Sequence, residues 1–315
     1  MVSRTDTTLP AGCTVRAPRL DDVGAITAFV QEYTRAVIGF ADYTEDDVRD
    51  DLTEPGFDID RDARLVFHGD TLAGHATAVG KAGSDRVEID VVAPDPRIRA
   101  YLFDWALARA ADRGPRVTVD HGVYRADTAL REQSAAHGFA VATTFHRMRI
   151  DHEGAVPAPP APPGVVLRQG TDPAVRHAAH AVHERSFTEH FGHVPEPFED
   201  WHEALDRKSV FDWPMLWVAE LDGEPAGMLL CSDQFADDED CGYVDTLGVV
   251  PAARGRGIAK FLLRHAFALD AAAGRTGTLL HVDSNNTTPA LGVYESAGMR
   301  AVLVIDVWRR ALVTG

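Results

Sequence analysis

The second half of the chain alternates between short apolar runs and longer segments with a helical period. Apolar runs bounded by Gly, Pro or Asp are typical of strands, and apolar residues three and four apart are typical of a helix that packs on one face. Six runs predict strands, at residues 165–169, 215–221, 226–233, 242–250, 278–282 and 301–309. Three periodic segments predict helices, at residues 172–187, 257–273 and 289–297. Antiparallel strands followed by strand–helix–strand units predict a mixed α/β (α+β) sheet.

The same succession of elements occurs twice along the chain. Residues 87–110 parallel residues 242–269, since each segment has an apolar strand, a proline and then a helix. Between the two halves, residues 151–164 contain five prolines and show neither the helical nor the strand pattern of apolar residues. This is typical of an extended linker. We therefore expect a duplicated unit. Its domains are predicted at residues 1–150 and 165–315, with residues 151–164 as the linker.

Composition is that of a globular protein. The chain has 315 residues, 45% of them hydrophobic and 25% charged, which suits two domains of ordinary composition. No apolar stretch reaches the roughly 18 residues that a membrane-spanning helix needs, and the first residues lack the apolar core of a secretory signal. We therefore predict a cytoplasmic protein without a membrane partner, and leave open whether it is a monomer or a homodimer.

The cysteine spacing and the net charge argue against disulfide-rich, zinc-binding and nucleic-acid-binding proteins. Cys13, Cys231 and Cys241 have no CxxC spacing, so neither a disulfide framework nor a zinc site is predicted. The formal net charge of -17 argues against a nucleic-acid partner, because phosphate contacts need clustered Lys and Arg. Acidic clusters at residues 42–62 and 237–240 are interpreted either as solubilising surface or as a field that attracts a cationic amine.

The segment with the most specific chemistry lies before the predicted helix at 257–273. Arg254, Gly255, Arg256 and Gly257 precede an apolar stripe. The stripe comprises Ile258, Phe261, Leu262, His265, Ala266 and Leu269. Free N–H groups at a helix start form an anion site, glycines let a ligand approach the backbone, and the arginines add positive charge. Glycines also serve ordinary tight turns, so this segment by itself is a weak signal.

A second segment follows about 25 residues later. Thr288 and Pro289 suit the N-cap and first positions of a helix, and Gly298 suits the residue after its end. Within this helix Tyr294 lies on the apolar stripe. It is interpreted either as a packing residue or as a hydroxyl directed at the ligand of the Arg-Gly segment.

These two segments together resemble the GNAT superfamily of N-acetyltransferases over residues 165–310. The acyl-CoA signature Q/R-x-x-G-x-G/A of that family is matched by Arg254, Gly257 and Ala259. Its later pattern is matched by Asn286, Ala290, Tyr294, Glu295, Gly298 and Met299. The double layout is similar to that of tandem GNAT enzymes of the mycothiol synthase type. The resemblance implies two GNAT-like domains and a co-substrate, acetyl-CoA, without a metal.

The resemblance also implies roles for single residues. The pyrophosphate of coenzyme A would lie on the amides of residues 255–259, which include Ile258. The pantetheine arm would run beside main-chain groups near Leu247 and Val249, and Asn286 would touch the pantetheine or the phosphates. Tyr294 would donate a proton to the departing thiolate, and an amide near Leu247 would stabilise the oxyanion.

The acceptor side of the predicted site is less defined. Enzymes of the mycothiol synthase type have a glutamate in the preceding strand, and the matching position here is Tyr243. Asp245 lies two residues on and shares its face if the strand alternates regularly, so we expect it to be the base. The alternative is that Asp245 only hydrogen-bonds within the strand.

Residues 184–205 are expected to form the wall of the acceptor pocket. Their candidate pocket residues are His190, His193, Glu196 and Trp201, each of which is also interpreted as surface or packing. The two histidines lie three residues apart, but no third ligand follows at a spacing that would suggest a metal.

The first half lacks the corresponding chemistry. Asp95 and Pro96 stand where the second half has the Arg-Gly segment, and they suit the N-cap and first positions of a helix. A carboxylate there would repel a phosphate. We therefore expect a degenerate GNAT-like domain without an acyl-CoA loop, which packs on the other half or holds a separate ligand.

Three functions fit these observations. The first is an acetyl-CoA-dependent N-acetyltransferase for the primary amine of a small molecule, with direct transfer in the C-terminal half; mycothiol synthase proper is one form of it. The second is a non-catalytic acyl-CoA-binding or regulatory module, which would not need Tyr294. The third is acetylation of protein amines, which needs a groove open to a peptide.

Overall fold

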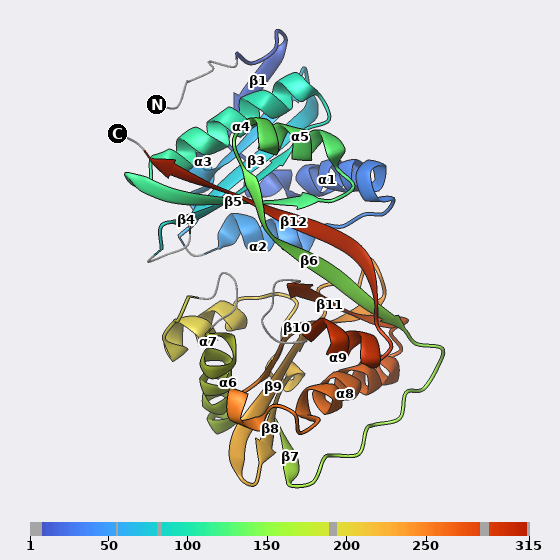
Figure 1. Cartoon of the computed structure of the whole chain (residues 1–315). Helices are drawn as coiled ribbons and strands as arrows, with labels where there is room; N and C mark the ends of the chain where they lie inside the picture. Colours follow the sequence, from blue (N-terminus) through green and yellow to red (C-terminus); the bar gives the residue numbers. More distant parts are fainter. Residues whose placement is uncertain (1–7, 55, 81–83, 189–193, 284–289, 314–315) are drawn as a thin grey trace. The chain divides into compact units, whose positions relative to one another are not determined.

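The computed structural model describes residues 8–54, 56–80, 84–188, 194–283 and 290–313 (Figure 1). The chain packs into two compact units. Unit 1 is Met1–Thr144 with Val304–Gly315, and unit 2 is Phe145–Leu303. The last residues thus pack with the first half, although the repeat in the sequence assigns them to the second. The predicted limits 1–150 and 165–315 describe the repeat along the chain rather than these packing units.

Unit 1 is built on a mixed sheet of strand order β1-β2-β3-β4-β5-β12. Neighbouring strands are antiparallel except β4 and β5, which are parallel. The strands are β1 (Cys13–Arg16), β2 (Ala63–His68), β3 (Thr71–Gly80), β4 (Arg86–Val92), β5 (Arg116–Tyr124) and β12 (Arg300–Val313). The helices are α1 (Val23–Ile38), α2 (Glu45–Thr53), α3 (Ile59–Asp62), α4 (Pro96–Ala111) and α5 (Thr128–Ala136). Apolar clusters lie on both faces of this sheet, with α4 on one face and α1 and α2 on the other.

Unit 2 repeats the same order with its own strands, β7-β8-β9-β10-β11-β6. Here β10 and β11 are the parallel pair and the other neighbours are antiparallel. The strands are β6 (Ala140–Asp151), β7 (Val165–Gln169), β8 (Leu216–Leu221), β9 (Glu224–Ser232), β10 (Cys241–Val249) and β11 (Gly277–Asp283). The helices are α6 (Pro173–Phe187), α7 (Phe198–Asp206), α8 (Ile258–Ala272) and α9 (Ala290–Ser296). The duplicated mixed α/β sheet predicted from the sequence is thereby confirmed.

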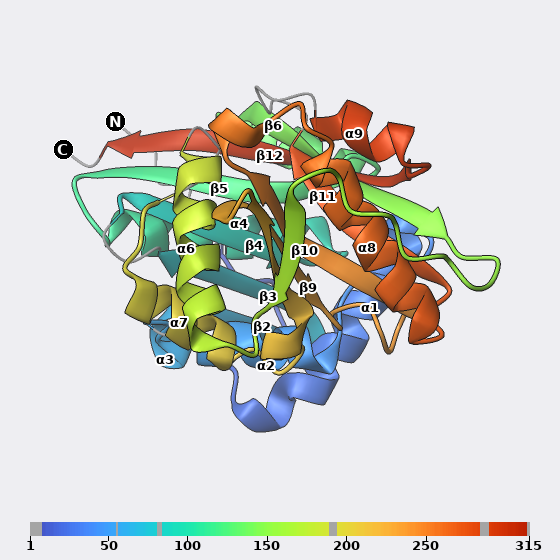
Figure 2. The same cartoon turned by 90° about the horizontal axis from the view of Figure 1, so that it is seen from below.

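Helices α6 and α8 cover opposite faces of the sheet of unit 2 (Figure 2). A Cβ atom at Gly227 of β9 would lie 2.9 Å from Ile258 of α8, and one at Gly248 of β10 would lie 3.0 Å from Ser186 of α6. Glycines therefore let both helices approach the strands closely. Their local sequences also fit, since Asp172 caps α6 by accepting a hydrogen bond from the Ala174 amide.

The predicted elements of the second half agree with the structure to within a few residues. Two differences have physical reasons. Leu269 at the end of the α8 stripe is exposed, while Leu263 and Phe267 are buried in addition to the predicted positions, so the contact face is wider and rotated. Helix α7 was missed, because it is short and begins after Pro197 without a side-chain cap. Within the described ranges, no helix is long and apolar enough to cross a membrane.

The close contact at Gly227 generates the first prediction. Gly227→Ala should destabilise unit 2 by about 1–3 kcal/mol, because the added methyl group overpacks the contact between β9 and α8. Urea unfolding followed by tryptophan fluorescence measures the shift. Gly292→Ala in α9 is the matched control, since a Cβ atom there meets nothing within 4 Å. Equal stability of the two variants would contradict the proposed contact.

Candidate functional site

The site of unit 2 begins where β10 separates from β11. The two strands pair from Cys241 to Val244, and the pairing ends there although β10 continues to Val249. On its other edge β10 stays paired with β9, with Leu247 opposite Leu229. One edge of residues 245–249 thus lacks a neighbouring strand within the described sheet. Backbone N–H and C=O groups on such an edge can pair with an extended ligand.

Asp245 lies at an irregularity of β10. The register to β9 shifts between Val244 and Thr246, which makes Asp245 the extra residue of a β-bulge. A bulge leaves its extra residue unpaired and redirects its side chain, and bulges are common beside active sites. Because the bulge interrupts regular alternation, the period-2 reasoning that placed Asp245 on the face of Tyr243 does not hold across this position.

The start of α8 forms a second side of the candidate site, next to the unpaired edge of β10. Gly255 and Gly257 have φ values of +78° and +79°, a left-handed conformation that favours glycine, and a Cβ atom at either would meet nothing within 4 Å. Gly257 is the N-cap, and no side chain of the described residues caps this helix. The first amides of α8 therefore keep their positive partial charge for an external anion.

A cavity of about 720 Å³ connects these features. Its lining includes residues 243–249 of β10, the end of α6, the start of α8 and one side of α9. This size is typical of a cavity that holds a small-molecule ligand. The uncapped amides and the unpaired strand edge thus open into one space.

Tyr294 reaches this cavity from α9. Its side chain is buried, with 8% exposed, and burial raises its pKa to about 12. The phenol therefore stays protonated at neutral pH and can donate a hydrogen bond. The Lys260 ammonium donates to the Ser296 carbonyl over 3.1 Å, which ties the end of α9 to the first turn of α8. Tyr294 is thus held beside the anion-binding start of α8.

Asp245 is a buried carboxylate of the cavity, whose lining also includes Asp283. Its side chain is 14% exposed, and its Oδ1 atom lies 3.9 Å from the Lys208 ammonium. Burial raises the pKa of Asp245, and the charge of Lys208 opposes that rise. Among the residues that the structure describes, its Oδ2 atom has no hydrogen-bond partner. A buried acceptor without a partner is unfavourable unless a ligand supplies the donor.

The structure brings most of the predicted residues to the cavity. Its lining includes Tyr243, Asp245, Leu247, Val249, Arg254, Gly255, Gly257, Ile258, Ala259 and Tyr294. Arg256 is exposed and is not part of the lining. Asn286, His190 and His193 lie outside the described residues.

Two predicted acceptor residues lie elsewhere. Trp201 is buried in the core of unit 2 at 6% exposure, tilted against Trp213 at a ring distance of 6.3 Å. Glu196 is partly exposed, and its backbone carbonyl contacts the His180 ring over 3.0 Å. Neither residue lines the cavity. An aromatic residue at helical spacing is more often part of a core than of a pocket, and the structure places Trp201 in that way.

Some lining residues were not singled out from the sequence. Ser186 and Phe187 at the end of α6 approach Gly248 and fall within the predicted wall at residues 184–205, whereas His281 of β11, which accompanies Tyr243, was missed. Gly248 within a predicted strand was a usable signal, because such a glycine often marks a close approach. His281 had no local signal, since its partners come from distant segments.

The start of α4 in unit 1 has a side-chain cap. Asp95 caps this helix by accepting from the Arg97 amide over 2.8 Å, and its carboxylate also pairs with the Arg97 guanidinium. These hydrogen bonds lower the pKa of Asp95 to about 2. The predicted cap is therefore present. A carboxylate occupies the position where unit 2 offers free amides.

Comparisons with known proteins agree with this geometry. The model of the acetyltransferase (GNAT) family matches residues 174–299. The chain is 30% identical over 244 residues to a mycothiol acetyltransferase of Acidothermus cellulolyticus, which covers 73% of each chain.

Solved structures show the same architecture over nearly the whole chain. A GCN5-related N-acetyltransferase from Sphaerobacter thermophilus superimposes with a TM-score of 0.82 at 25% identity, covering 98% of each chain. A tandem GNAT protein from the clavulanic acid biosynthesis pathway superimposes with a TM-score of 0.76 at 15% identity, covering 95% of this chain and 98% of that one. By these matches and the relative above, the chain belongs to the GNAT family of acetyltransferases.

Proposed function

We propose that this chain is an acetyl-CoA-dependent N-acetyltransferase that modifies the primary amine of a small molecule. The transfer is direct, with both substrates bound, and takes place in unit 2. The observation that carries the proposal is the single cavity that joins the uncapped start of α8, the unpaired edge of β10, Tyr294 and Asp245. A site for a charged, extended acyl donor and the groups for proton transfer thus share one space.

The donor site follows from the backbone. Amides of residues 255–259 hold the pyrophosphate of coenzyme A, and Arg254 adds charge at the same turn. Main-chain groups of Leu247 and Val249 pair with the pantetheine arm as a strand would. The amide of Leu247 stabilises the negative charge that develops on the thioester oxygen.

Two side chains move the protons. Asp245 accepts a proton from the acceptor's ammonium, and the neutral amine forms its bond to the thioester carbon. Its raised pKa suits this role, since a base works best with a pKa nearer neutrality. As the carbon–sulfur bond breaks, the thiolate takes the proton of Tyr294. The products are an amide and a free thiol.

The acceptor is proposed as a small amine. The name of the Acidothermus relative makes the amine of a mycothiol precursor the first compound to test. Tyr243 at the position of the expected glutamate distinguishes this chain from the mycothiol synthase type, so other amino sugar conjugates, amino acids and antibiotic amines belong in the same panel. Release of free thiol with each amine tests the function itself.

The coenzyme site generates the second prediction. Gly257→Ala should weaken binding of coenzyme A about tenfold or more, because Gly257 lines the cavity and an added methyl group would take up space at the proposed pyrophosphate site. Calorimetry measures the affinity. Gly274→Ala at the other end of α8 is the matched control, with φ +82° and the same open surroundings. Equal affinities of the two variants would refute the assignment of the α8 start.

Tyr294 generates the third prediction. Tyr294→Phe should lower kcat by a factor of about 10² to 10⁴ with little change in the KM for acetyl-CoA, because only the proton donor is removed. Since its pKa is about 12, the wild-type rate should show no alkaline loss from this group below pH 10. Thiol release reports both effects. Tyr101→Phe in α4 is the control, and a Tyr294→Phe enzyme with full kcat would exclude the proposed donor.

Lys208 generates the fourth prediction. Its charge favours the ionised form of Asp245, so Lys208→Met should raise the pKa of that carboxyl further. The carboxylate is needed as a base, so activity is present above this pKa and lost as the pH falls through it. The acid limb of kcat/KM should therefore move to higher pH.

The measurement is a pH–rate profile. Arg207→Met is the control, because the neighbouring Arg207 pairs with Glu203. Asp245→Asn should lose the limb together with most of the rate. An acid limb that stays in place in Lys208→Met, or a full rate in Asp245→Asn, would rule out Asp245 as the base.

A further inference from the structure

A half-exposed lysine lies beside the proposed base. Lys208 follows α7, and its ammonium is 3.9 Å from the Oδ1 atom of Asp245. This distance is longer than a hydrogen bond, so the ammonium is close to the carboxylate without being fixed to it. A small movement of the lysine side chain brings the two groups within reach of proton transfer. An amine of the chain itself thus lies where the acceptor's amine is proposed to lose its proton.

The backbone around Lys208 is held in place. Its amide donates to the Leu205 carbonyl over 3.1 Å, and its carbonyl accepts from the Phe211 amide over 3.3 Å. The Val210 carbonyl accepts from the Asp233 amide over 2.9 Å, which ties this turn to the end of β9. Because the backbone is fixed next to the sheet, only the flexible side chain of Lys208 has to move to reach the base.

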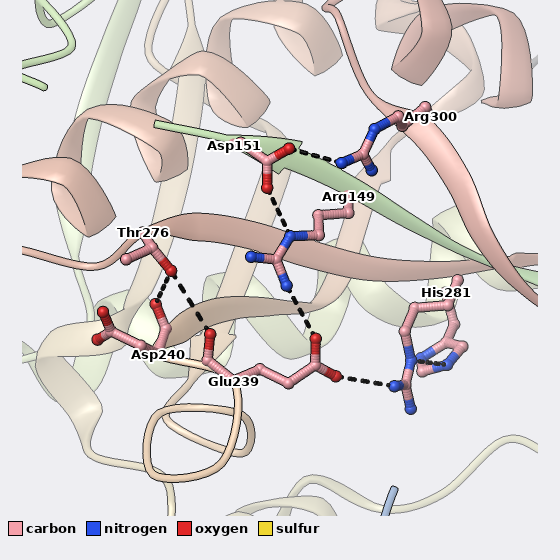
Figure 3. Close-up of polar contacts among 8 residues, drawn as sticks. Arg149, Asp151, Glu239, Asp240, Thr276, His281 and Arg300 are labelled. Carbon is pink, nitrogen blue, oxygen red and sulfur yellow. Dashed lines mark hydrogen bonds and ion pairs between the residues drawn. The ribbon is translucent and has the colours of Figure 1, made fainter. Parts of the chain in front are cut away.

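A second group of charges in unit 2 is built from arginines (Figure 3). Arg149 donates to Glu239 over 2.9 Å and to Asp151 over 2.7 Å, and Arg300 donates to Asp151 over 2.6 Å. Arg147 contacts the Glu239 carboxylate at 3.1 Å. A guanidinium keeps its proton at any pH of an assay, so it does not become a nucleophilic amine. An acyl group can therefore be accepted by a lysine but not by these arginines.

The chain has few lysines that could compete. Of its 31 Lys and Arg residues, three are lysines, Lys81, Lys208 and Lys260. Lys81 lies outside the described residues. Lys260 of α8 donates to the Ser296 carbonyl over 3.1 Å, whereas Lys208 is ion-paired with Asp245. A lysine is almost fully protonated at neutral pH and needs a base before it can attack, which favours Lys208.

We propose that this protein transfers an acetyl group to the ε-amine of its own Lys208 when no other amine is bound. The inference rests on the proposed function and uses the same groups. Asp245 takes a proton from the Lys208 ammonium, and the neutral amine forms its bond to the thioester carbon of acetyl-CoA. The carbon–sulfur bond breaks, and the thiolate takes the proton of Tyr294. The nitrogen releases a second proton as the amide forms, which restores the phenol, and Asp245 gives its proton to solvent.

The modification would limit the enzyme's own activity. Acetylation removes the charge of Lys208, and that charge opposes the rise in the pKa of Asp245. The base of the modified chain would then be protonated at higher pH than that of the unmodified chain. Activity is lost as the pH falls through this pKa, so the acetylated chain should show the shifted acid limb expected for Lys208→Met.

Mass spectrometry of the chain itself tests the inference. The wild type is incubated with acetyl-CoA and no amine, and each lysine peptide is read for an added acetyl group. Lys208 should be labelled roughly a hundredfold faster than Lys260, the lower end of what a positioned base contributes. Asp245→Asn and Tyr294→Phe should lose this preference, and calorimetry with coenzyme A shows that both variants still fold. Equal labelling of the two lysines in the wild type, or an unchanged rate in Asp245→Asn, overturns the inference.

A relocated lysine separates position from exposure. Arg207→Lys combined with Lys208→Arg moves the amine by one residue. The Arg207 side chain is 53% exposed and pairs with Glu203, and that of Lys208 is 46% exposed. The double variant keeps a cation next to Asp245 and should not be labelled at position 207. Labelling there as fast as at Lys208 of the wild type would show chemical acetylation of exposed amines and would overturn the inference.

Mixing shows whether the transfer takes place within one chain. The Tyr294→Phe variant still carries Lys208, so it should stay unlabelled when it is mixed with the wild type. The labelling rate of the wild type should not depend on its concentration. Label on the Tyr294→Phe chain, or a rate that rises with concentration, would contradict transfer of the acetyl group to the chain's own lysine.

An amine substrate separates this inference from the proposed function. An amine that the wild type acetylates should protect Lys208, because both need the place next to Asp245. If amines are acetylated while Lys208 stays unmodified, or if a saturating amine leaves its labelling unchanged, the inference is wrong and the proposed function stands. If neither amines nor Lys208 are acetylated, the proposed function itself is wrong.

Discussion

The separation of β10 from β11 after Val244 is the constraint on which the site of this acetyltransferase depends. A parallel pair that continued to Val249 would use its backbone groups internally and leave no edge for a ligand. Instead β11 pairs with β6 along its whole length, and the bulge at Asp245 helps to turn β10 away. The space between the strands is then bounded by α8 and α9, whose contact at Lys260 and Ser296 keeps the phenol of Tyr294 beside the helix start.

The two units differ at the start of the helix that follows the first strand of each parallel pair. Both sheets have the same strand order, and each parallel pair is followed by a long helix on one face. At the start of α8, Gly257 has no side chain to offer and the amides are directed outward. At the start of α4, the Asp95 carboxylate accepts a hydrogen bond from the Arg97 amide, so the chain itself supplies the acceptor. Because the first amides of a helix need hydrogen-bond acceptors, the residue at the N-cap decides whether the chain supplies one of them itself.

A buried guanidinium contacts one of the residues that line the cavity. Arg147 is not among the lining residues, yet it contacts His281, whose Nδ1 atom lies 2.8 Å from the Tyr243 hydroxyl. Such a network is sensitive to each member, since a buried guanidinium that loses its carboxylate is strongly unfavourable. The cavity thus adjoins uncapped amides at the start of α8 and a buried polar network beside β11.

Local patterns in the sequence determined most elements of the second half, the mixed sheet, the glycine turn at α8 and the Asp95 cap of α4. Each of these follows from residues within one or two turns of chain, where periodicity, capping and backbone conformation are decided. Only the tertiary structure decided that residues 304–315 pack with unit 1, that Asp245 occupies a bulge, and that Trp201 belongs to the core. It also decided the pairing of Arg147 with His281, which are 134 positions apart. Such contacts depend on which strands become neighbours, and no local pattern carries that information.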